Sequence, residues 1–497
     1  TAVGARIEMI NKIKNFKKAS DGVKASVVYT LSSLFTRGLA IITVPVFTRL
    51  MSSEEIGIVN LYNSWFAMIS VVTTLSLTSG GFQLAMKEFR NERNQYVSSV
   101  LTLTSAMAGL TFLIYLIKPS FWNNITGLPT GLMLLLLVDL LFSPAQSFWL
   151  SRQRYEYKYK AVAAVSFLSA LAASVLSVIV VVWGSNRNYS NLGCLRLYAN
   201  YAVLLPVAAW IWVSIYVKGK TIYSKKYWQF SLRLSIPLIG NAVASQILSV
   251  SDRTMISKMV GNSAVGIYST LYTVSSLSLI IWQAINASFV PFLFENIDNP
   301  EKEHDIKKLS SELLVAFAVV AFLLTVMAPE IVAILATKEY YEAIYIMPPI
   351  CAGVFLTSLS NMYTNVLIYH KKTSFVMISS IVAAIVNIVL NLIGIRVFGY
   401  MAAAYTTLIA YIILAVMQGI VSTKVHKQVS GNDNAEVYDT KFVYSLAVLT
   451  IVICTACVIL YQYTILRYSI FGLIVILAIV NRKRIASIFQ KKHTPNG

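Results

Sequence analysis

The chain has 497 residues, of which 57% are hydrophobic and only 12% are charged, and its formal net charge is +20. A soluble protein carries about 25% charged residues, so this composition excludes a soluble globular chain and indicates a polytopic membrane protein. The lysines and arginines lie in short segments between apolar stretches, where they orient membrane helices, so no nucleic-acid partner is expected.

The first segment, residues 1–24, has one apolar face and one basic face. Ile7, Ile10, Ile13 and Phe16 recur at helical spacing, with lysines on the other face. This pattern predicts an amphipathic helix on the anionic cytoplasmic leaflet, and a frayed basic tail is the alternative. The apolar run that follows is too long for a signal peptide and lacks a cleavage site, so we expect no cleaved leader.

Fourteen segments are long and apolar enough to cross a bilayer, which takes about 20 helical residues. They predict an all-α polytopic membrane protein with 14 transmembrane helices. The ranges are 25–48, 56–79, 96–117, 129–150, 161–183, 192–216, 229–252, 265–289, 310–328, 343–368, 374–395, 400–421, 442–461 and 465–481.

The basic residues alternate between the segments that connect these helices. Segments on the side of the N-terminus hold 30 lysines and arginines, and the opposite segments hold 8. Because positive charge is retained in the cytoplasm, both termini are expected there.

The first predicted helix carries an arginine near its centre. Arg37 follows Thr30 and Ser33 on one helix face. A guanidinium group at that depth costs about 2.5–3.5 kcal/mol on insertion scales, and it is too deep to reach a surface. Arg37 is therefore expected to face an aqueous cavity, although a buried ion pair with Asp139 is an alternative.

Other polar side chains also fall in or beside predicted helices. Asp139 shares a helix stripe with Ser143 and Gln146. For the arginines near helix ends, extension to the headgroup region is the alternative to a binding role. The further candidates for binding are Arg49, Arg196, Arg233 and Arg253. The candidates for ion coupling or for lining a polar cavity are Asp139, Asp252, Asn361, Asn365, Asn387 and Asn391.

The asparagine pairs and the remaining reactive residues have simpler interpretations. Asn361/Asn365 and Asn387/Asn391 are each spaced i, i+4, and they could bind sugar hydroxyls, help to bind a cation, or hydrogen-bond neighbouring helices. All four cysteines lie within or at the ends of apolar segments, and all four histidines lie outside the predicted helices. We therefore expect no metal, no cofactor and no enzymatic activity, while coupling to a Na⁺ or H⁺ gradient stays open.

Two short stretches repeat each other at a fixed offset. "TRLMSSEEIGIVNLY" follows the first predicted helix, and "SKMVGNSAVGIYSTLY" follows the seventh. Arg49 and Gly57 match Lys258 and Gly266 at the same offset of 209 residues. Six helices separate the copies, so they have the same orientation and indicate a parallel repeat. The predicted organisation is an N-terminal segment (1–24), two six-helix bundles (25–220 and 221–425) and two extra helices with a basic tail (426–497).

The two stretches also carry a resemblance to a known family. "VPVFTRLMSSEEIGIVNL" and "SDRTMISKMVGNSAVGIYSTLY", with Asp252, Arg253, Gly261, Gly266 and Tyr268, resemble the Wzx-type oligosaccharide flippases. These form the polysaccharide-transporter branch of the multidrug/oligosaccharidyl-lipid/polysaccharide exporter superfamily. The resemblance implies two bundles around a central cavity, alternating access, and a bacterial inner (plasma) membrane location.

The resemblance also implies a cargo and partners. The cargo is an undecaprenyl-diphosphate-linked oligosaccharide repeat unit, moved to the outer leaflet for O-antigen (lipopolysaccharide) or capsule assembly. A polysaccharide polymerase and a chain-length regulator are the implied partners, besides membrane lipid. For this cargo, guanidinium groups suit a diphosphate because they bind it bidentately. Arg37 would be a central clamp, and Arg49, Arg196 and Arg253 would be successive stations toward the outside.

Three alternatives remain. A lipid II flippase is hard to separate from an oligosaccharide flippase by sequence. A multidrug exporter of the same superfamily is disfavoured because arginines would repel cationic drugs. A membrane enzyme is disfavoured because no acid/base pair converges.

Overall fold

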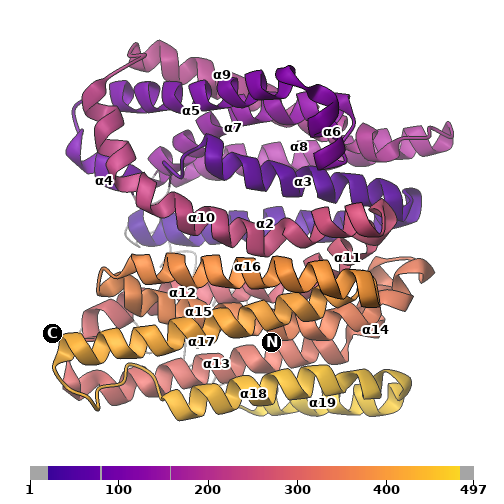
Figure 1. Ribbon diagram of the computed structural model, residues 1–497, viewed down its shortest axis with the longest axis vertical. Coiled ribbons are helices and arrows are strands. Elements are labelled where there is room, and N and C mark those ends of the chain that lie inside the picture. Colours follow the sequence, from indigo (N-terminus) through magenta and orange to yellow (C-terminus); the bar gives the residue numbers. More distant parts are fainter. Residues whose placement is uncertain (1–20, 79–80, 157, 482–497) are drawn as a thin grey trace, which may run out of the picture. The chain divides into compact units, whose positions relative to one another are not determined.

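The computed structural model describes residues 21–78, 81–156 and 158–481, and within these ranges the chain is helical with no strand (Figure 1). Residues 1–20 of the predicted amphipathic segment lie outside the described residues. The helices are α2 (Asp21–Leu50), α3 (Ser53–Thr73), α4 (Gly81–Glu88), α5 (Arg93–Ile117), α6 (Pro119–Thr126), α7 (Thr130–Tyr155), α8 (Tyr159–Asn186), α9 (Leu192–Gly219), α10 (Lys225–Met259), α11 (Asn262–Ser275), α12 (Ser278–Asn296), η1 (Pro300–Lys302), α13 (Glu303–Val326), α14 (Ala328–Leu335), η2 (Lys338–Ile346), α15 (Met347–Tyr369), α16 (Thr373–Phe398), α17 (Ala402–Ser430), α18 (Thr440–Ala456), η3 (Cys457–Gln462) and α19 (Thr464–Val480).

The all-α membrane class is confirmed. Every predicted transmembrane segment overlaps a helix. Among the described residues, 10 helices are long and apolar enough to cross a membrane, or 11 if the two parts of α10 are one span. Pro237, a residue type that breaks helical hydrogen bonding, lies in the sequence where the two parts of α10 meet. The total of fourteen crossings stays a prediction.

The predicted eighth helix, residues 265–289, differs from the structure. It is two helices, α11 and α12, separated at Ser276 and Leu277. The hydroxyl of Ser275 donates to the Leu271 carbonyl at 2.8 Å, and that of Ser276 donates to the Thr273 carbonyl at 3.0 Å. Such side-chain bonds to the preceding turn bend helices, so the serine pair accounts for the break.

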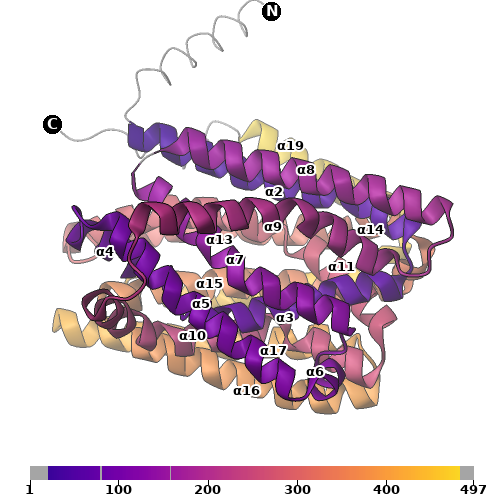
Figure 2. The same ribbon diagram turned by 90° about the horizontal axis from the view of Figure 1, so that it is seen from above.

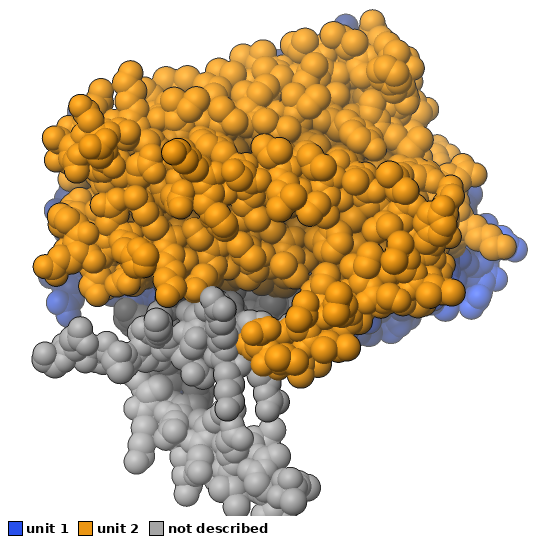
Figure 3. Space-filling view, turned by 90° about the horizontal axis from the view of Figure 1, so that it is seen from below, with its two compact units in different colours: residues 1–51, 65–242 blue, residues 52–64, 243–497 orange. Residues whose placement is uncertain are grey.

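The chain divides into two compact units. Unit 1 comprises residues 1–51 and 65–242, and unit 2 comprises residues 52–64 and 243–497 (Figure 3). The boundary runs through α3, whose first residues belong to unit 2, and through α10.

In unit 1, long helices pack along one another. α8 lies beside α2 and α9, and α7 lies beside α5 and α9 (Figure 2). An aromatic core joins α4, α5, α7 and the start of α10, where the Tyr96 and Ser231 hydroxyls lie 2.8 Å apart. Its buried rings are Phe82, Phe89, Tyr96, Phe148 and Tyr227. Aromatic rings contribute large buried areas, so this cluster anchors one end of the unit.

Unit 2 is organised around α15. This helix packs against α11, α12, α13, α17 and α18, and α16 packs against α17. In the most apolar 18-residue stretch of η2 and α15, 89% is buried inside the protein, whereas the same share for α8 of unit 1 is 22%. α15 is therefore a central helix, surrounded by protein on most sides.

The two copies of the sequence repeat meet inside unit 2. A Cβ atom on Gly57 would lie 1.8 Å from the Asn262 carbonyl oxygen, and one on Gly266 would lie 1.9 Å from the Ser53 carbonyl oxygen. Ser53 and Asn262 are themselves equivalent positions of the repeat, so the contact is reciprocal. Only glycine permits this approach of α3 and α11.

Polar side chains surround that glycine contact. The hydroxyls of Ser53 and Ser263 lie 2.6 Å apart, and Ser53 donates to Glu339 at 2.5 Å. A carboxylate from η2 thus joins the starts of α3 and α11. The repeat found in the sequence is a physical contact in the folded chain.

Candidate functional site

Helix α8 of unit 1 carries a face of small and hydroxylated side chains. Ser166, Ser169 and Ser174 share one face of this helix with Ala170 and Ala173. The facing side of α2 carries Ser32, Thr36 and Ala40 at intervals of four residues, again small or hydroxylated. Small side chains leave space between helices that larger ones would fill, so the sequence itself creates a void here.

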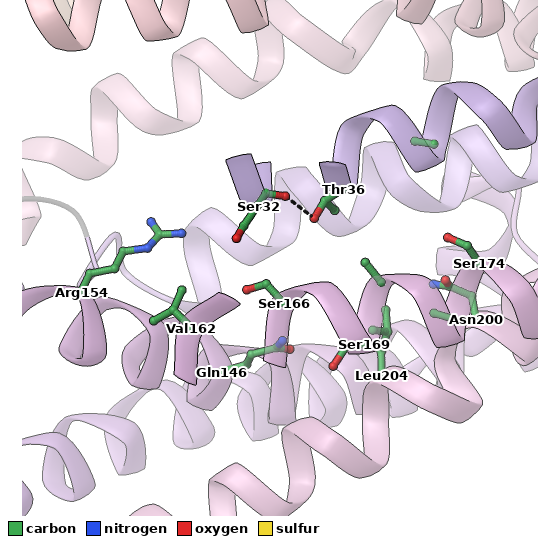
Figure 4. Close-up of a pocket in the computed structure, with 13 residues that line it drawn as sticks. Ser32, Thr36, Gln146, Arg154, Val162, Ser166, Ser169, Ser174, Asn200 and Leu204 are labelled. Atoms are coloured by element: carbon green, nitrogen blue, oxygen red, sulfur yellow. Dashed lines mark hydrogen bonds between the residues drawn. The ribbon is translucent and has the colours of Figure 1, made fainter. Parts of the chain in front are cut away.

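That void is a cavity of about 530 Å³ within unit 1, shown in Figure 4. α2, α7, α8 and α9 supply its walls. Its lining residues are Ser32, Thr36, Ala40, Gln146, Arg154, Val162, Ser166, Ser169, Ala170, Ala173, Ser174, Asn200 and Leu204. The volume is sufficient for a ligand of several sugar-sized rings or a small organic molecule.

The two ends of the cavity differ in charge. Arg154, an exposed residue in the last turn of α7, lies at one end, and Ser174 and Asn200 lie at the other (Figure 4). Between them the donors and acceptors are hydroxyls and amides, and no carboxylate lines the described cavity. Such a surface suits a neutral polyol, with an anionic group near the guanidinium.

The hydroxyls of α2 are partly occupied. Thr36 donates to the Ser32 carbonyl at 2.9 Å, which leaves its oxygen able to accept from a ligand (Figure 4). Ser169 on α8 is buried, whereas Thr36 is exposed to the cavity. The site therefore mixes buried and solvent-reached hydroxyls.

Of the predicted arginines of unit 1 whose side chains the structure describes, none lines this cavity. Arg37 lies in α2, but its side chain is outside the described part of the structure, as are those of Thr30 and Ser33. Arg49 is exposed at the end of α2, and Arg233 is exposed on α10. Arg49 thus lies at a helix end, whereas Arg233 lies about two turns inside α10.

Arg196 has a definite partner in unit 1. Its guanidinium carbon lies 3.7 Å from the centre of the Phe47 ring, which α2 presents to α9. Cation–π contacts of this kind stabilise a partly buried guanidinium. Arg196 therefore joins α2 to α9 and is not among the residues that line the cavity.

Arg253 and Asp252 form a buried cluster in unit 2. Their side chains are 2.8 Å apart, and Tyr268 donates its hydroxyl to the other Asp252 oxygen at 2.5 Å. The guanidinium also lies 4.2 Å from the Tyr272 ring centre and donates to the Ser249 carbonyl. Because charge and hydrogen bonds are satisfied within the cluster, its geometry is that of a structural ion pair.

Asn387 and Asn391 belong to a hydrogen-bond network among α10, α16 and α17. Ser251 donates to Asn387 at 3.3 Å, Asn387 donates to Thr407 at 3.1 Å, and Asn391 donates to Asn387 at 3.2 Å. Thr406 completes the network by donating to Asn391. Both asparagines are fully buried. The geometry corresponds to the helix–helix alternative considered for these residues.

The remaining predicted polar residues are dispersed. Asn365 donates to Asn286 at 2.8 Å between α15 and α12, and Asn361 is half-buried on α15. Asp139 is buried in α7 and interacts with Tyr201 of α9. Gln146, one of its predicted stripe partners, does line the cavity.

Sequence reasoning missed most of the cavity. Its serines, Asn200 and Arg154 were not among the predicted site residues. A signal existed, because Ser166, Ser169 and Ser174 share one face of the predicted helix 161–183. Serines at helix-packing positions are common, so this pattern alone did not distinguish a cavity from close packing.

Comparison with known protein families gives one match that covers more than half of the chain. Residues 23–297 match the model of a family described as "Polysaccharide biosynthesis protein". This agrees with the resemblance found in the sequence.

Two curated proteins are related in sequence. The succinoglycan biosynthesis transport protein ExoT of Rhizobium meliloti is 26% identical over 292 residues, covering 57% of this chain and 56% of that protein. The probable low-salt glycan biosynthesis flippase Agl15 of Haloferax volcanii is 18% identical over 401 residues, covering 80% and 82%. The match to the first thus spans little more than half of that relative.

Solved structures show the same fold. An inward closed conformation of the lipid II flippase MurJ has a TM-score of 0.60 at 17% identity, covering 92% of this chain and 100% of that one. An inward-facing multidrug resistance transporter of the MATE family, within the MOP superfamily, has a TM-score of 0.61 at 12% identity, covering 81% and 99%. The chain therefore shares the fold of these two transporters.

Proposed function

Because the chain belongs to the polysaccharide biosynthesis protein family, we propose that it is a flippase for undecaprenyl-diphosphate-linked oligosaccharides. It moves the lipid-linked repeat unit from the cytoplasmic to the outer leaflet by alternating access. The product enters O-antigen, capsular or exopolysaccharide assembly. The proposed location is a bacterial inner (plasma) membrane with both termini in the cytoplasm, as the distribution of lysine and arginine indicates.

The observation that carries this proposal is the cavity of unit 1. Hydroxyl and amide groups line a space of about 530 Å³ among apolar helices, with the Arg154 guanidinium at one end. A sugar hydroxyl needs such partners, because burying a polar group without a hydrogen bond costs several kcal/mol. A diphosphate needs positive charge for the same reason.

A separate apolar groove in unit 2 has the chemistry that a polyprenyl tail requires. It lies between α13 and α18, with a volume of about 270 Å³, and Thr450 and Cys454 are the least apolar residues of its lining. The other lining residues are Val315, Ala318, Val319, Phe322, Leu446, Leu449 and Ile453. A hydrocarbon chain can occupy such a groove without dehydrating polar groups.

The lining of the cavity also bears on the alternatives. A multidrug exporter that takes cationic compounds would benefit from a carboxylate, and none lines this cavity. Lipid II carries the same diphosphate and polyprenyl groups, so only its sugars distinguish it from a lipid-linked repeat unit as cargo. Arg37, Arg49, Arg196, Arg233 and Arg253 stay proposed contacts for the diphosphate, and a polymerase, a chain-length regulator and a Na⁺ or H⁺ gradient stay proposed partners.

The cargo can be identified in cells that lack the protein. We expect a lipid-linked repeat unit to accumulate on the cytoplasmic face, because synthesis continues while export stops. Mass spectrometry of extracted lipids would give its sugar composition. Accumulation of lipid II instead would assign the alternative cargo, and an unchanged lipid profile would contradict both.

Filling the cavity is expected to stop export without unfolding the protein. In Ser169→Leu, a buried hydroxyl is replaced by a larger apolar group, which occupies the space proposed for the sugar. We expect surface polysaccharide to fall at least tenfold, with the protein still present in the membrane. The measurement is surface polysaccharide per amount of membrane-inserted protein.

The matched control is Ala164→Leu, an exposed position on α8 that does not line the cavity. The same helix and the same added side chain should there leave export unchanged. Normal polysaccharide in Ser169→Leu would remove the cavity from the transport path.

A further inference from the structure

Two histidines meet at one end of unit 2. His370 directly follows α15, and His426 lies near the end of α17. His370 Nε2 and His426 Nδ1 are 3.0 Å apart; His370 is partly exposed and His426 is buried. This hydrogen bond between imidazoles adds to the apolar contact of Leu367, Val376 and Val425 near the same ends of α15 and α17.

The pair borders a cavity of about 420 Å³. Three carboxylates line the same space: Asp298 before η1, Glu303 at the start of α13, and Glu436 between α17 and α18. The proposed function uses none of these groups. In the orientation proposed above, this end of unit 2 faces the cytoplasm.

The charges around the pair come from every neighbouring segment. Tyr369 donates to Asp298 at 2.5 Å, and Lys307 pairs with Glu303 at 2.6 Å. The other titratable residues of these segments include Glu301, Lys302, His304, Asp305, Lys308, Glu312, Lys371, Lys372, Lys424, Lys427, Asp433, Tyr438 and Asp439. Asp298 interacts electrostatically with both imidazoles, and Glu303 with that of His426.

The hydrogen bond between the rings depends on their protonation. In the neutral pair, one ring donates its N–H and the other accepts it. One added proton keeps a donor and an acceptor in place, but a second leaves two N–H groups facing each other at 3.0 Å with no acceptor. Two positive rings at that distance also repel each other.

The surroundings of His370 oppose proton uptake. Burial lowers the pKa of His370 from its ordinary value, and Asp298 offsets this only in part. A histidine with a lowered pKa in the folded state favours folding above the unfolded value of about 6.5, and this contribution is lost as the pH falls below it. The contact is therefore present at neutral pH and weakens in acid.

We propose that His370 and His426 form a proton-binding site that holds the ends of α15 and α17 together at neutral pH and releases them when the cytoplasm becomes acidic. This inference concerns the regulation of the proposed transporter. It rests on the orientation in the proposed function and does not depend on the identity of the cargo.

The first test follows thermal unfolding of the purified full-length protein in detergent between about pH 5 and pH 8. In the native chain, we expect the unfolding midpoint to fall as the pH passes below about 6.5. For each proton that the unfolded state binds in excess, the ratio of folded to unfolded protein falls by up to about tenfold per pH unit. Replacing His370 or His426 with Gln should flatten the curve in that range, because glutamine hydrogen-bonds without titrating. An unchanged curve in both variants would overturn the proposal.

His304→Gln is the matched control, because His304 is an exposed histidine on α13 in the same unit. It should leave the native pH dependence intact, since His304 lies outside the hydrogen-bonded pair of His370 and His426. A flattening equal to that of His370→Gln would show a general charge effect and contradict the site.

Two further measurements separate this proposal from other outcomes. Repeating the titration with Zn²⁺ and then with a chelator tests a metal; stabilisation by Zn²⁺ that requires both histidines would assign a metal site and overturn the proton site. No group of three metal-ligating side chains occurs among the described residues. Because unfolding is measured without cargo, the outcome of this test does not depend on the outcome of the export experiments.

Discussion

Gly266→Ala is expected to destabilise the protein, although alanine is normally the better helix residue. Alanine in place of glycine usually stabilises a helix by up to about 1 kcal/mol. Here the added Cβ would lie 1.9 Å from the Ser53 carbonyl oxygen, so α3 and α11 must separate. Overpacking of this kind costs about 1–3 kcal/mol, and we expect a lower unfolding midpoint and reduced export.

The second copy of the repeat allows an equivalent substitution, and a glycine in α19 provides a control. Gly57→Ala meets the Asn262 carbonyl at 1.8 Å and should have the same sign of effect as Gly266→Ala. Gly472→Ala in α19 has no atom within 4 Å of the new Cβ and should be neutral or stabilising. Equal midpoints for Gly266→Ala and Gly472→Ala would show that the close contact does not exist in the membrane protein.

Asp252→Asn is expected to have the largest single effect on stability. It removes the counter-charge of Arg253, which is buried within α10 beside Tyr272. Removing one partner of a buried pair costs about 3–5 kcal/mol, because the other charge is left uncompensated. The measurement is the thermal unfolding midpoint in detergent, compared with the native chain.

A double variant separates structure from cargo binding. Asp252→Leu with Arg253→Met removes both charges, and it should recover most of the stability, as apolar replacements of buried ion pairs do. If this variant folds and still exports polysaccharide, Arg253 does not bind the diphosphate. If this variant folds but export is lost, the result supports the proposed contact between Arg253 and the cargo.

The amino-acid sequence by itself determined the membrane class, the all-helical fold, the approximate positions of the helices and the family. These are local properties, because about 20 apolar residues suffice to specify a membrane helix. A repeated motif is likewise detected in the sequence without knowledge of tertiary contacts. The Gly57/Gly266 repeat was also visible, although its reciprocal contact was not.

Only the tertiary structure decided which polar residues share a site. The sequence made Arg253 a candidate anion-binding residue, and the structure places Asp252, Tyr268 and Tyr272 around it. The Ser166–Ser174 face of α8 became a candidate site only through the cavity beside it. The physical reason is that lipid and protein interior are equally apolar, so hydrophobicity does not reveal which face of a membrane helix meets a neighbour. That choice depends on contacts between helices distant in the chain.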